Sequence, residues 1–461
     1  MTVATARVRD AVDPVAPWVV QPEADAVIQA LLHDALALLP EAAAFSARLH
    51  AETGIRLIDV LDHIAVAPSR LSPAQLALTG FTVSGDHPTV GIHERGIFPD
   101  VVIREHARLT LAMQVESVAD FCAAQQLDVV IEGAPGGTYR RAVAWHNAHA
   151  ELLVVERHGH VGFALPTHDA AQLVAAQMHL EAFRKRRRLF DDPGAGFDAT
   201  EALVRRAVDA LGPHWSCALF LRAEREYWER RNQTARVQKA RQDAMGLGWC
   251  NDDHHTYDAS REWFSRTIDV LELLGFRCRE RFYAGAEAGW GSQILEQPVL
   301  GTVIFADIDL APDELEGDFA HSPAMQPLST MRRAGLWCAL HGESMLEAGI
   351  NHLECTYDQQ ALRAQLKDIG ITMMAPFSNF PHLYQELSEG EWWPVRPARI
   401  DALLAAGIIT EEAARDFRER GAIGSHLENL ERNYGYKGFN QPGISEVLRI
   451  IDPREFVQPV A

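Results

Sequence analysis

The sequence predicts an α+β fold made of paired β–α–β units with helical insertions. Three observations predict it: short apolar runs separated by Gly, Pro and Asp in two stretches, an almost wholly helical stretch between them, and a histidine pattern that recurs in both α+β stretches. At 461 residues the chain exceeds one ordinary domain. We therefore expect several packed units and no single core.

The first part of the chain divides into a helical segment and an α+β stretch. Residues 1–50 are expected to form an N-terminal helical segment, because Ala and Leu are dense up to His50, with a break near Pro40. Residues 51–168 are expected to form the first paired-unit domain. Its expected strands cover residues 57–67, 109–115, 127–132 and 151–156, and residues 115–126 have helical spacing.

Residues 169–248 are predicted to be a helical connector. The spacing of apolar and capping residues predicts helices over 170–190, 198–211 and 223–245. The connector contains the only basic run of the chain, Lys185-Arg186-Arg187-Arg188. We interpret this run as a solvated helix C-terminus, which the helix dipole favours, and we assign it no function.

Residues 249–461 are predicted to form a second paired-unit domain. Expected strands cover residues 251–257, 276–283, 301–308, 349–357, 371–376 and 443–451. Expected helices cover residues 260–274, 359–369 and 400–428. Residues 385–392 have the pattern of a helix end or a loop.

An acidic or amide residue followed by histidine recurs three times ahead of a helix and a Gly-apolar strand start. The three pairs are Asp62-His63, Asp253-His254 and Asn351-His352, and they lead to Gly80, Gly275 and Gly370 at similar intervals. Each segment is therefore interpreted as one β–α–β unit that carries its histidine on the first strand. A fourth unit, over residues 109–132, has no histidine on its first strand.

Two such units that face one another would bring their histidines into one concavity. One strand carboxylate would then complete a 2-His-1-carboxylate face, the ligand set typical of non-haem iron(II) oxygenases. We predict His254 and His352 as ligands, with His255 as a competitor of His254. The first pair has only His63, which we interpret as a hydrogen-bonded structural residue in a degenerate pair.

The third ligand is predicted from strand alternation. In residues 443–451, alternation places Glu446 on a face of apolar residues, where a carboxylate is costly unless it is paired or metal-bound. Glu446 is the first choice, although it could also lie at a strand edge or pair with Arg449. Its rivals are Glu389, Glu386 and Glu391.

Composition excludes some other functions. The formal net charge of −20 disfavours nucleic acids and anionic membranes as partners. The six cysteines are scattered without a C-x-x-C pair, and neither a signal peptide nor a bilayer-spanning apolar stretch is present. We expect a soluble, unsecreted, cytoplasmic protein and leave open whether it forms a homo-oligomer.

The repeated histidine segments resemble the vicinal oxygen chelate superfamily, whose members build metal cups from paired βαβββ modules. Residues 249–461 resemble more narrowly the 2-oxoadipate dioxygenase/decarboxylase family. The resemblance is carried by Asp253-His254-His255-Thr256-Tyr257 and by Gly349-Ile350-Asn351-His352-Leu353. A weaker similarity runs from His426-Leu427-Glu428 to Tyr436, Phe439 and Gly443-Ile444.

The resemblance implies an Fe(II) enzyme that uses O₂ to decarboxylate a small 2-oxo acid oxidatively and to hydroxylate the shortened acid. It implies that His254 and His352 are the two histidine ligands. Because the family's glutamate lies on a strand before a helix, the resemblance favours Glu389 or Glu386. The inward face of the last expected strand still favours Glu446, so the two lines of reasoning disagree.

The resemblance also implies a substrate-binding arginine that this chain lacks. The family commonly has arginine four residues after its first histidine, where this sequence has Asp258. Arg261 is the nearest replacement and our candidate catalytic residue, with Arg279 and Arg281 as alternatives.

Two other functions fit the same residues. One is an O₂-independent, glyoxalase-like isomerase or lyase that uses Zn²⁺, Ni²⁺ or Mn²⁺. The other is a non-catalytic protein that binds a small molecule.

Overall fold

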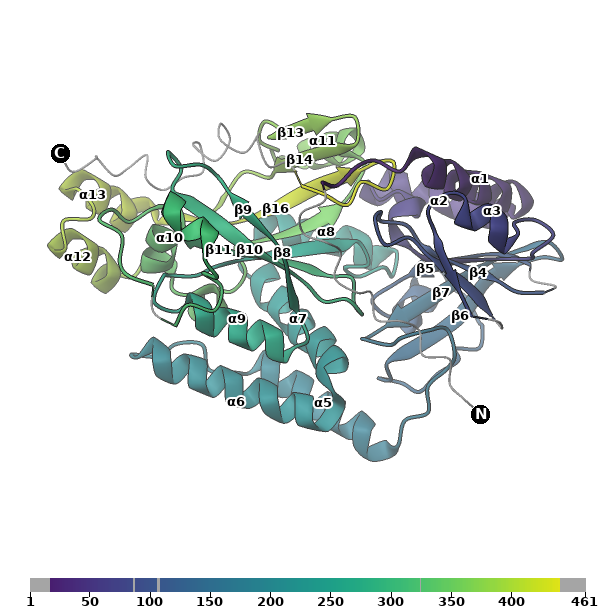
Figure 1. Cartoon of the computed structure of the whole chain (residues 1–461), viewed down its shortest axis with the longest axis horizontal. Coiled ribbons are helices and arrows are strands. Elements are labelled where there is room, and N and C mark those ends of the chain that lie inside the picture. The colour runs from purple at the N-terminus through teal and green to yellow at the C-terminus, as the bar shows by residue number, and fades with distance from the viewer. Residues whose placement is uncertain (1–16, 86–87, 106–107, 324, 440–461) are drawn as a thin grey trace.

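The computed structural model describes residues 17–85, 88–105, 108–323 and 325–439, and it contains two mixed β-sheets with helices packed on them. Figure 1 shows the first sheet at the right, the second sheet at the centre and the connector helices of residues 170–229 below them. The predicted α+β class is confirmed.

The first sheet has the strand order β2-β3-β4-β1-β5-β7-β6. Its helices are α3 (Pro73–Ala77) and α4 (Val118–Ala124). Its strands are β1 (Leu61–Val66), β2 (Thr82–Ser84), β3 (Thr89–Ile92), β4 (Asp100–Ile103), β5 (Leu109–Gln114), β6 (Tyr139–His146) and β7 (Ala150–Arg157).

The second sheet has the order β13-β14-β16-β12-β8-β11-β10-β9, with β15 paired to β16. Its modules contain α9 (Phe264–Leu273) and α11 (Gln359–Asp368). Its strands are β8 (Asp252–Asp258), β9 (Arg277–Tyr283), β10 (Trp290–Glu296), β11 (Val303–Asp309), β12 (His352–Thr356), β13 (Ser378–Phe380), β14 (Leu383–Leu387), β15 (Glu391–Trp393) and β16 (Ala422–Arg432).

The two sheets repeat one topology. In the first sheet, β1 is antiparallel to β5, and these strands are flanked by parallel partners β4 and β7. In the second sheet, β8 is antiparallel to β12, and these strands are flanked by parallel partners β11 and β16. Each sheet is therefore a pair of modules whose first strands lie side by side, as the paired-module prediction requires.

The N-terminal helices end and begin where the sequence predicts a break. Helix α1 (Pro22–Leu38) and helix α2 (Pro40–Thr53) meet at Leu39, where Pro40 starts the second helix at a position that needs no backbone N–H. Among the described residues, no single helix is long and apolar enough to cross a membrane. The pair α1 and α2 passes that test only when taken together, across a bend of 116°.

The connector consists of α5 (Ala170–Arg184), α6 (Pro193–Leu211), α7 (Pro213–Glu229) and α8 (Gln233–Ala244). Helix α6 begins five residues before the predicted start, because Asp192 caps its N-terminus with bonds to the N–H groups of Gly194 and Ala195. The single helix predicted over 223–245 is wrong. Asn232 interrupts it and caps α8 through the N–H of Ala235.

The apolar core is continuous across the molecule. One cluster of buried side chains extends from Ile28 in α1 through Phe121 in α4 and Trp228 in α7 to Leu353 in β12. The expectation of separate cores is wrong, because the connector helices bring large aromatic side chains into contact with both halves of the chain. Smaller clusters lie outside it, for example the one around Phe417 in α13 (Glu411–Arg420).

Several predicted elements in the second half differ from the structure. The helix predicted over residues 400–428 is replaced by two shorter helices, α12 (Pro397–Ala405) and α13, and by the start of β16. Gly421 ends α13 with φ of +80°, and β16 begins at the next residue. Residues 371–376 form only an isolated bridge at Met373, as do residues 127–132 at Glu132. Residues 385–392 contribute to β14 and β15. The strand predicted over 443–451 lies outside the described residues.

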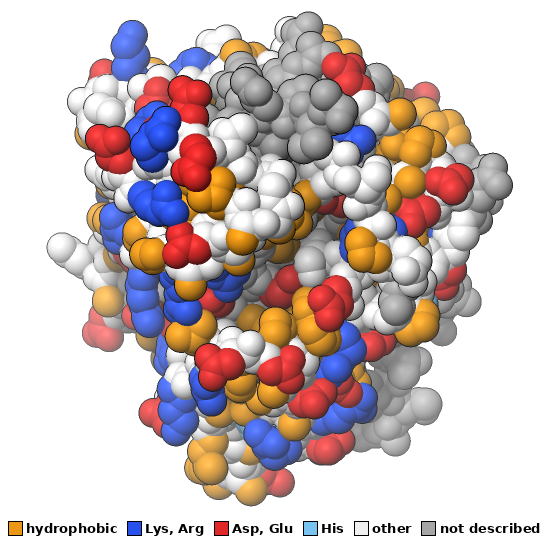
Figure 2. Space-filling model, turned by 90° about the vertical axis from the view of Figure 1, so that its left-hand side faces the viewer, with side chains coloured by type: hydrophobic (Ala, Val, Ile, Leu, Met, Phe, Trp, Pro, Cys, Tyr) orange, Lys and Arg blue, Asp and Glu red, His pale blue; other side chains and the backbone are white. Residues whose placement is uncertain are grey.

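The basic run 185–188 is not simply a solvated helix end. Arg186 and Arg188 are buried and both donate to the buried carboxylate of Glu224, at 3.0 and 2.6 Å. The run does follow the C-terminus of helix α5, which ends at Arg184, but the side chains of Arg186 and Arg188 are not solvated. Elsewhere, Figure 2 shows Lys and Arg interspersed with Asp and Glu on one face of the molecule.

Replacing Glu224 with Gln should lower the free energy of unfolding by about 3–5 kcal/mol, because two buried guanidinium groups would lose their counter-charge. Glu226→Gln is the matched control. It lies on the same helix and pairs with Arg184, but the two side chains are 25% and 33% exposed, so we expect a loss of about 1 kcal/mol or less. Urea denaturation measures both values, and equal losses would contradict this ranking.

Candidate metal centre

Three acidic and imidazole side chains form a row across the middle of the second sheet. The register pairs His254 of β8 with Glu354 of β12, and Glu354 with Glu428 of β16. Side chains paired in this way project from the same face of a sheet. One ligand atom from each residue lies within 4.8 Å of the other two, and all three residues are buried. The His254 Nε2 atom contacts Glu354 Oε2.

His352 lies one step along the same face. The register pairs it with Thr256 and His426, and its Nε2 atom is 3.6 Å from Oε2 of Glu428. His352 therefore reaches Glu428 from the row beside it. His255 projects to the opposite face, where its two ring nitrogens are buried without a hydrogen-bond partner in the described chain. The structure thus places His254, and not His255, in the cluster.

Residues that precede the histidines orient the imidazole rings. The carboxylate of Asp253 accepts a hydrogen bond from Nδ1 of His254 at 3.0 Å, and Arg432 holds that carboxylate at 3.3 Å. Nδ1 of His352 donates in the same way to Oδ1 of Asn351 at 3.0 Å. In both residues Nδ1 carries the proton, so the lone pair of Nε2 faces the carboxylates, as a metal ligand requires.

The orientation of Asn351 is itself fixed. Its amide Nδ2 donates to Asp258, and Asp258 accepts from Arg333 at 3.1 Å. Because Nδ2 is used in this way, Oδ1 of Asn351 is left to accept from His352. Asp258 stands where the resembled family has arginine, and here it supports a predicted ligand. The same Arg333 atom also donates to Asp307 at 2.8 Å.

Burial sets the protonation states of the cluster. Burial raises the pKa of Glu428 to about 8. Burial also raises the pKa of Glu354 well above its ordinary value, and the negative charge of the neighbouring Glu428 raises it further. Burial lowers the pKa of His254 to about 4 and that of His352 well below its ordinary value. At neutral pH the histidines are therefore neutral, and the two carboxyl groups retain a proton that a cation could displace.

The residues fit a divalent metal ion. Oε2 of Glu354 is buried and lacks a hydrogen-bond partner, while Gln385 donates to Oε1 of Glu354 at 3.1 Å and of Glu428 at 3.3 Å. One oxygen of each carboxyl group is thus held by the protein, and the others face His254 and His352. Imidazole and carboxylate donors suit Fe, Mn, Zn and Ni ions.

The first sheet lacks the corresponding carboxylates. Its equivalent row is His63 of β1, Ala112 of β5 and Leu153 of β7. His63 still bonds Asp62 at 2.7 Å, and Arg157 holds Asp62 as Arg432 holds Asp253. The first sheet thus repeats the aspartate and arginine that orient the imidazole, but His63 is the one residue of its row with a potential metal-ligand atom. That His63 is structural and that the first pair is degenerate stay predictions.

The predicted third ligands do not join the cluster in the described chain. Glu389 is exposed, and Glu386 is buried but pairs with Arg363. Glu391 accepts from the N–H of Gln233 at 2.8 Å. Glu446 lies outside the described residues, so its role stays a prediction.

Arg261 does not approach the row. Its guanidinium donates to Glu314 at 2.8 Å and to the carbonyl oxygens of Gln326 and Asp309. The alternatives Arg279 and Arg281 are engaged by Glu280 and by the carbonyls of Leu315 and Gly317. A substrate-binding role for Arg261 stays a prediction.

Glu354 and Glu428 were not predicted as ligands, although the sequence carries a signal for both. The tripeptide His-Leu-Glu occurs at residues 352–354 and again at 426–428, and the two copies lie in register on β12 and β16. The second copy was assigned to a helix, so the pairing could not be recognised.

A cavity of about 540 Å³ lies between the two halves, next to the row. Phe439 lines it and stands edge-on against the ring of His254, with centroids 5.3 Å apart. Charged side chains from both halves complete its wall, including Arg56, Asp59, Asp253, Arg279 and Arg432. The cavity has space for a small polar molecule, but none of His254, His352, Glu354 and Glu428 is among the residues that line it.

No family model matches the chain, and no curated protein sequence matches it. Solved structures match with low overlap. A variant of 4-hydroxymandelate synthase from Streptomyces coelicolor has a TM-score of 0.30 and 11% identity, covering 86% of this chain and 99% of that one. A protein described as belonging to the glyoxalase superfamily, from Ralstonia eutropha, has a TM-score of 0.32 and 14% identity, covering 57% and 95%.

Methylmalonyl-CoA epimerase from Mycobacterium tuberculosis has a TM-score of 0.23 and 13% identity, covering 40% of this chain and 89% of that one. The paired-module fold is shown by the strand order and register of the two sheets.

In the metal-free protein, Glu428 should make a contribution to stability that falls as the pH rises from about 5 to 8, whereas the neutral His254 and His352 make contributions that rise with pH below about 6.5. Glu428 has a pKa of about 8 when folded and an ordinary value of 4.5. Between these values the folded state holds a proton that the unfolded state has released, so the free energy of unfolding falls by roughly 1.4 kcal/mol per pH unit for this group.

Glu428→Gln should remove this contribution to the slope. Chemical denaturation in the presence of a chelator, at several pH values, measures both proteins. Parallel pH profiles for the wild type and the variant would contradict a buried, protonated Glu428.

Proposed function

We propose that this chain is a non-haem Fe(II)-dependent dioxygenase that acts on a small 2-oxo acid, with the metal held by His254, His352 and Glu428. The observation that carries the proposal is the buried cluster of His254, Glu354 and Glu428, with Nε2 of the second first-strand histidine, His352, at 3.6 Å from Oε2 of Glu428. Bound Fe(II) would supply a Lewis acid with positions for a chelating substrate and O₂. The 2-oxo acid follows from the sequence resemblance around His254 and His352.

The chain's own residues would orient the ligands and exclude water. Asp253 and Asn351 keep the proton of each imidazole on Nδ1, and Gln385 holds both carboxyl groups. Phe305 and Phe439 pack around His254, with ring centroids 4.7 and 5.3 Å from it. These rings shield one side of the site, which strengthens electrostatic interactions there.

Glu354 favours a second candidate, an O₂-independent isomerase or lyase. A 2-His-1-carboxylate set needs no second carboxylate, yet Glu354 is fully buried beside His254. If a bound cation displaced the proton of Glu354, the resulting carboxylate could take a proton from a substrate carbon and return it through Oε2. In that enzyme Glu354 would be the proton carrier or a fourth ligand.

The test is O₂ consumption by protein purified anaerobically, loaded with Fe(II) and supplied with a panel of 2-oxo acids. We expect Fe(II)-dependent O₂ uptake in the wild type and a loss of at least about 100-fold in His254→Ala and Glu428→Gln, since each removes a ligand. His63→Ala is the matched control, because it removes the equivalent imidazole from the first sheet, and it should retain uptake.

Two results would overturn the dioxygenase. One is turnover without O₂ in the presence of Zn²⁺, Ni²⁺ or Mn²⁺ that is abolished in Glu354→Gln while metal stays bound, which identifies the isomerase or lyase. The other is unchanged iron content in His254→Ala and Glu428→Gln, which places the metal elsewhere.

A further inference from the structure

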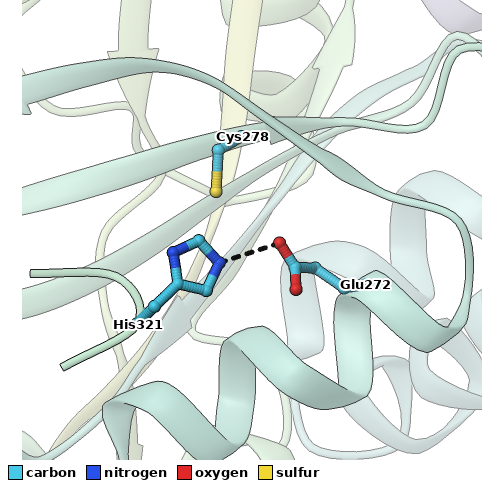
Figure 3. Close-up of side chains that lie close together, drawn as sticks. All are labelled: Glu272, Cys278 and His321. Carbon is cyan, nitrogen blue, oxygen red and sulfur yellow. Dashed lines mark hydrogen bonds and ion pairs between the residues drawn. The ribbon is translucent and has the colours of Figure 1, made fainter. Parts of the chain in front are cut away.

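A second cluster of potential metal ligands lies at the edge of the second sheet, separate from the row of His254, Glu354 and Glu428, which we call the cup. Glu272 comes from the last turn of α9, Cys278 from the edge strand β9, and His321 from the segment between β11 and α10 (Arg333–His341). One ligand atom from each lies within 4.8 Å of the others. Figure 3 shows the sulfur of Cys278 directed towards the ring of His321, with the carboxylate of Glu272 beside the ring.

From this geometry we propose a second metal site, selective for Zn²⁺ or a similar thiophilic divalent ion, with Glu272, Cys278 and His321 as ligands. It goes beyond the proposed dioxygenase and is independent of it. A thiolate, an imidazole and a carboxylate from three elements match the donors that bind zinc. Zinc bonds of about 2.0–2.3 Å require ligand atoms roughly 3–4 Å apart, so only small movements are needed.

The hydrogen bonds of His321 also allow a site without metal. His321 bonds Glu272 at 3.0 Å through Nε2 and Asp318 at 2.8 Å through Nδ1. This arrangement is an ion-pair network if the imidazole is protonated. Cys278 packs against the main apolar core and takes part in neither ion pair, but its sulfur lies where a metal ion bound by Glu272 and His321 could also be bound by a thiolate. Asp318 would then hold Nδ1–H and direct Nε2 to the ion, as second carboxylates do in zinc sites.

The site would fasten an irregular segment to the sheet. The segment that carries His321 leads into α10, whose first residue, Arg333, bonds Asp258 and Asp307. At present Arg281 holds this segment through the carbonyl of Gly317 at 2.7 Å, and Arg261 holds it through that of Gln326 at 2.7 Å. A metal ion would reinforce the link that His321, between these two contacts along the segment, already makes to Glu272.

Titration of the full-length protein with Co²⁺ tests the site without reference to activity. Cobalt bound to a thiolate gives an intense sulfur-to-metal charge-transfer absorption, and the cluster of His254, Glu354 and Glu428 has no sulfur donor. We expect this absorption in the wild type and in Glu428→Gln. Competition with Zn²⁺ should remove it.

Cys278→Ser should abolish the absorption, and His321→Asn should weaken Zn²⁺ binding at this site by at least about tenfold. His50→Ala is the matched control, because His50 is a similarly exposed histidine paired with the carboxylate of Asp358 at 3.3 Å. It should bind as the wild type does. Absence of thiolate absorption in the wild type, or unchanged Zn²⁺ affinity in both ligand variants, would show an ion-pair network only and would overturn the proposal.

Discussion

Two carboxyl groups buried side by side, Glu354 and Glu428, are the constraint around which the second sheet is arranged. They are paired in register on neighbouring strands and are almost completely shielded from water. Two ionised carboxylates in such a place repel one another and lose their hydration, which is costly unless a cation or a proton intervenes. Gln385 donates a hydrogen bond to each of them, and the imidazoles of His254 and His352 face them through Nε2, oriented by Asp253 and Asn351.

The first sheet shows that the fold itself does not need this row. It has the same central strand pairing, and it retains a histidine held by an aspartate and an arginine. In place of the two carboxylates it has Ala112 and Leu153, which pack in an apolar cluster with Tyr139. Since an apolar row is compatible with this architecture, the polar row of the second sheet is better explained by binding than by stability.

Much of this arrangement could be predicted from the sequence, because it depends on local patterns. The recurrent pairs Asp62-His63, Asp253-His254 and Asn351-His352 identified three first strands, and the structure gives each pair one role, since the first residue bonds Nδ1 of the second. The two halves, the helical connector and the break at Pro40 follow from periodicity and from proline. These signals lie within a few residues of one another.

The remaining features depend on contacts that local patterns do not contain. Strand β16 is buried over nearly its whole length, so it lacks the alternation that marks a half-buried strand, and it follows two helices directly. The sequence pattern therefore predicts helix up to residue 428 and does not identify Glu428 as a ligand. Arg333 bonds Asp258 from a helix far along the chain, which no spacing rule predicts. The repeated His-Leu-Glu tripeptide becomes meaningful only when β12 and β16 are known to be neighbours.

The most direct measurement is anomalous diffraction from crystals of the protein loaded with Fe(II) or Mn²⁺. A single strong peak should lie in the second sheet within about 2.0–2.2 Å of Nε2 of His254 and of a carboxylate oxygen of Glu428. If no anomalous peak lies near His254 and Glu428 and the ion is found only at other residues, the assignment of these side chains as a metal centre is contradicted.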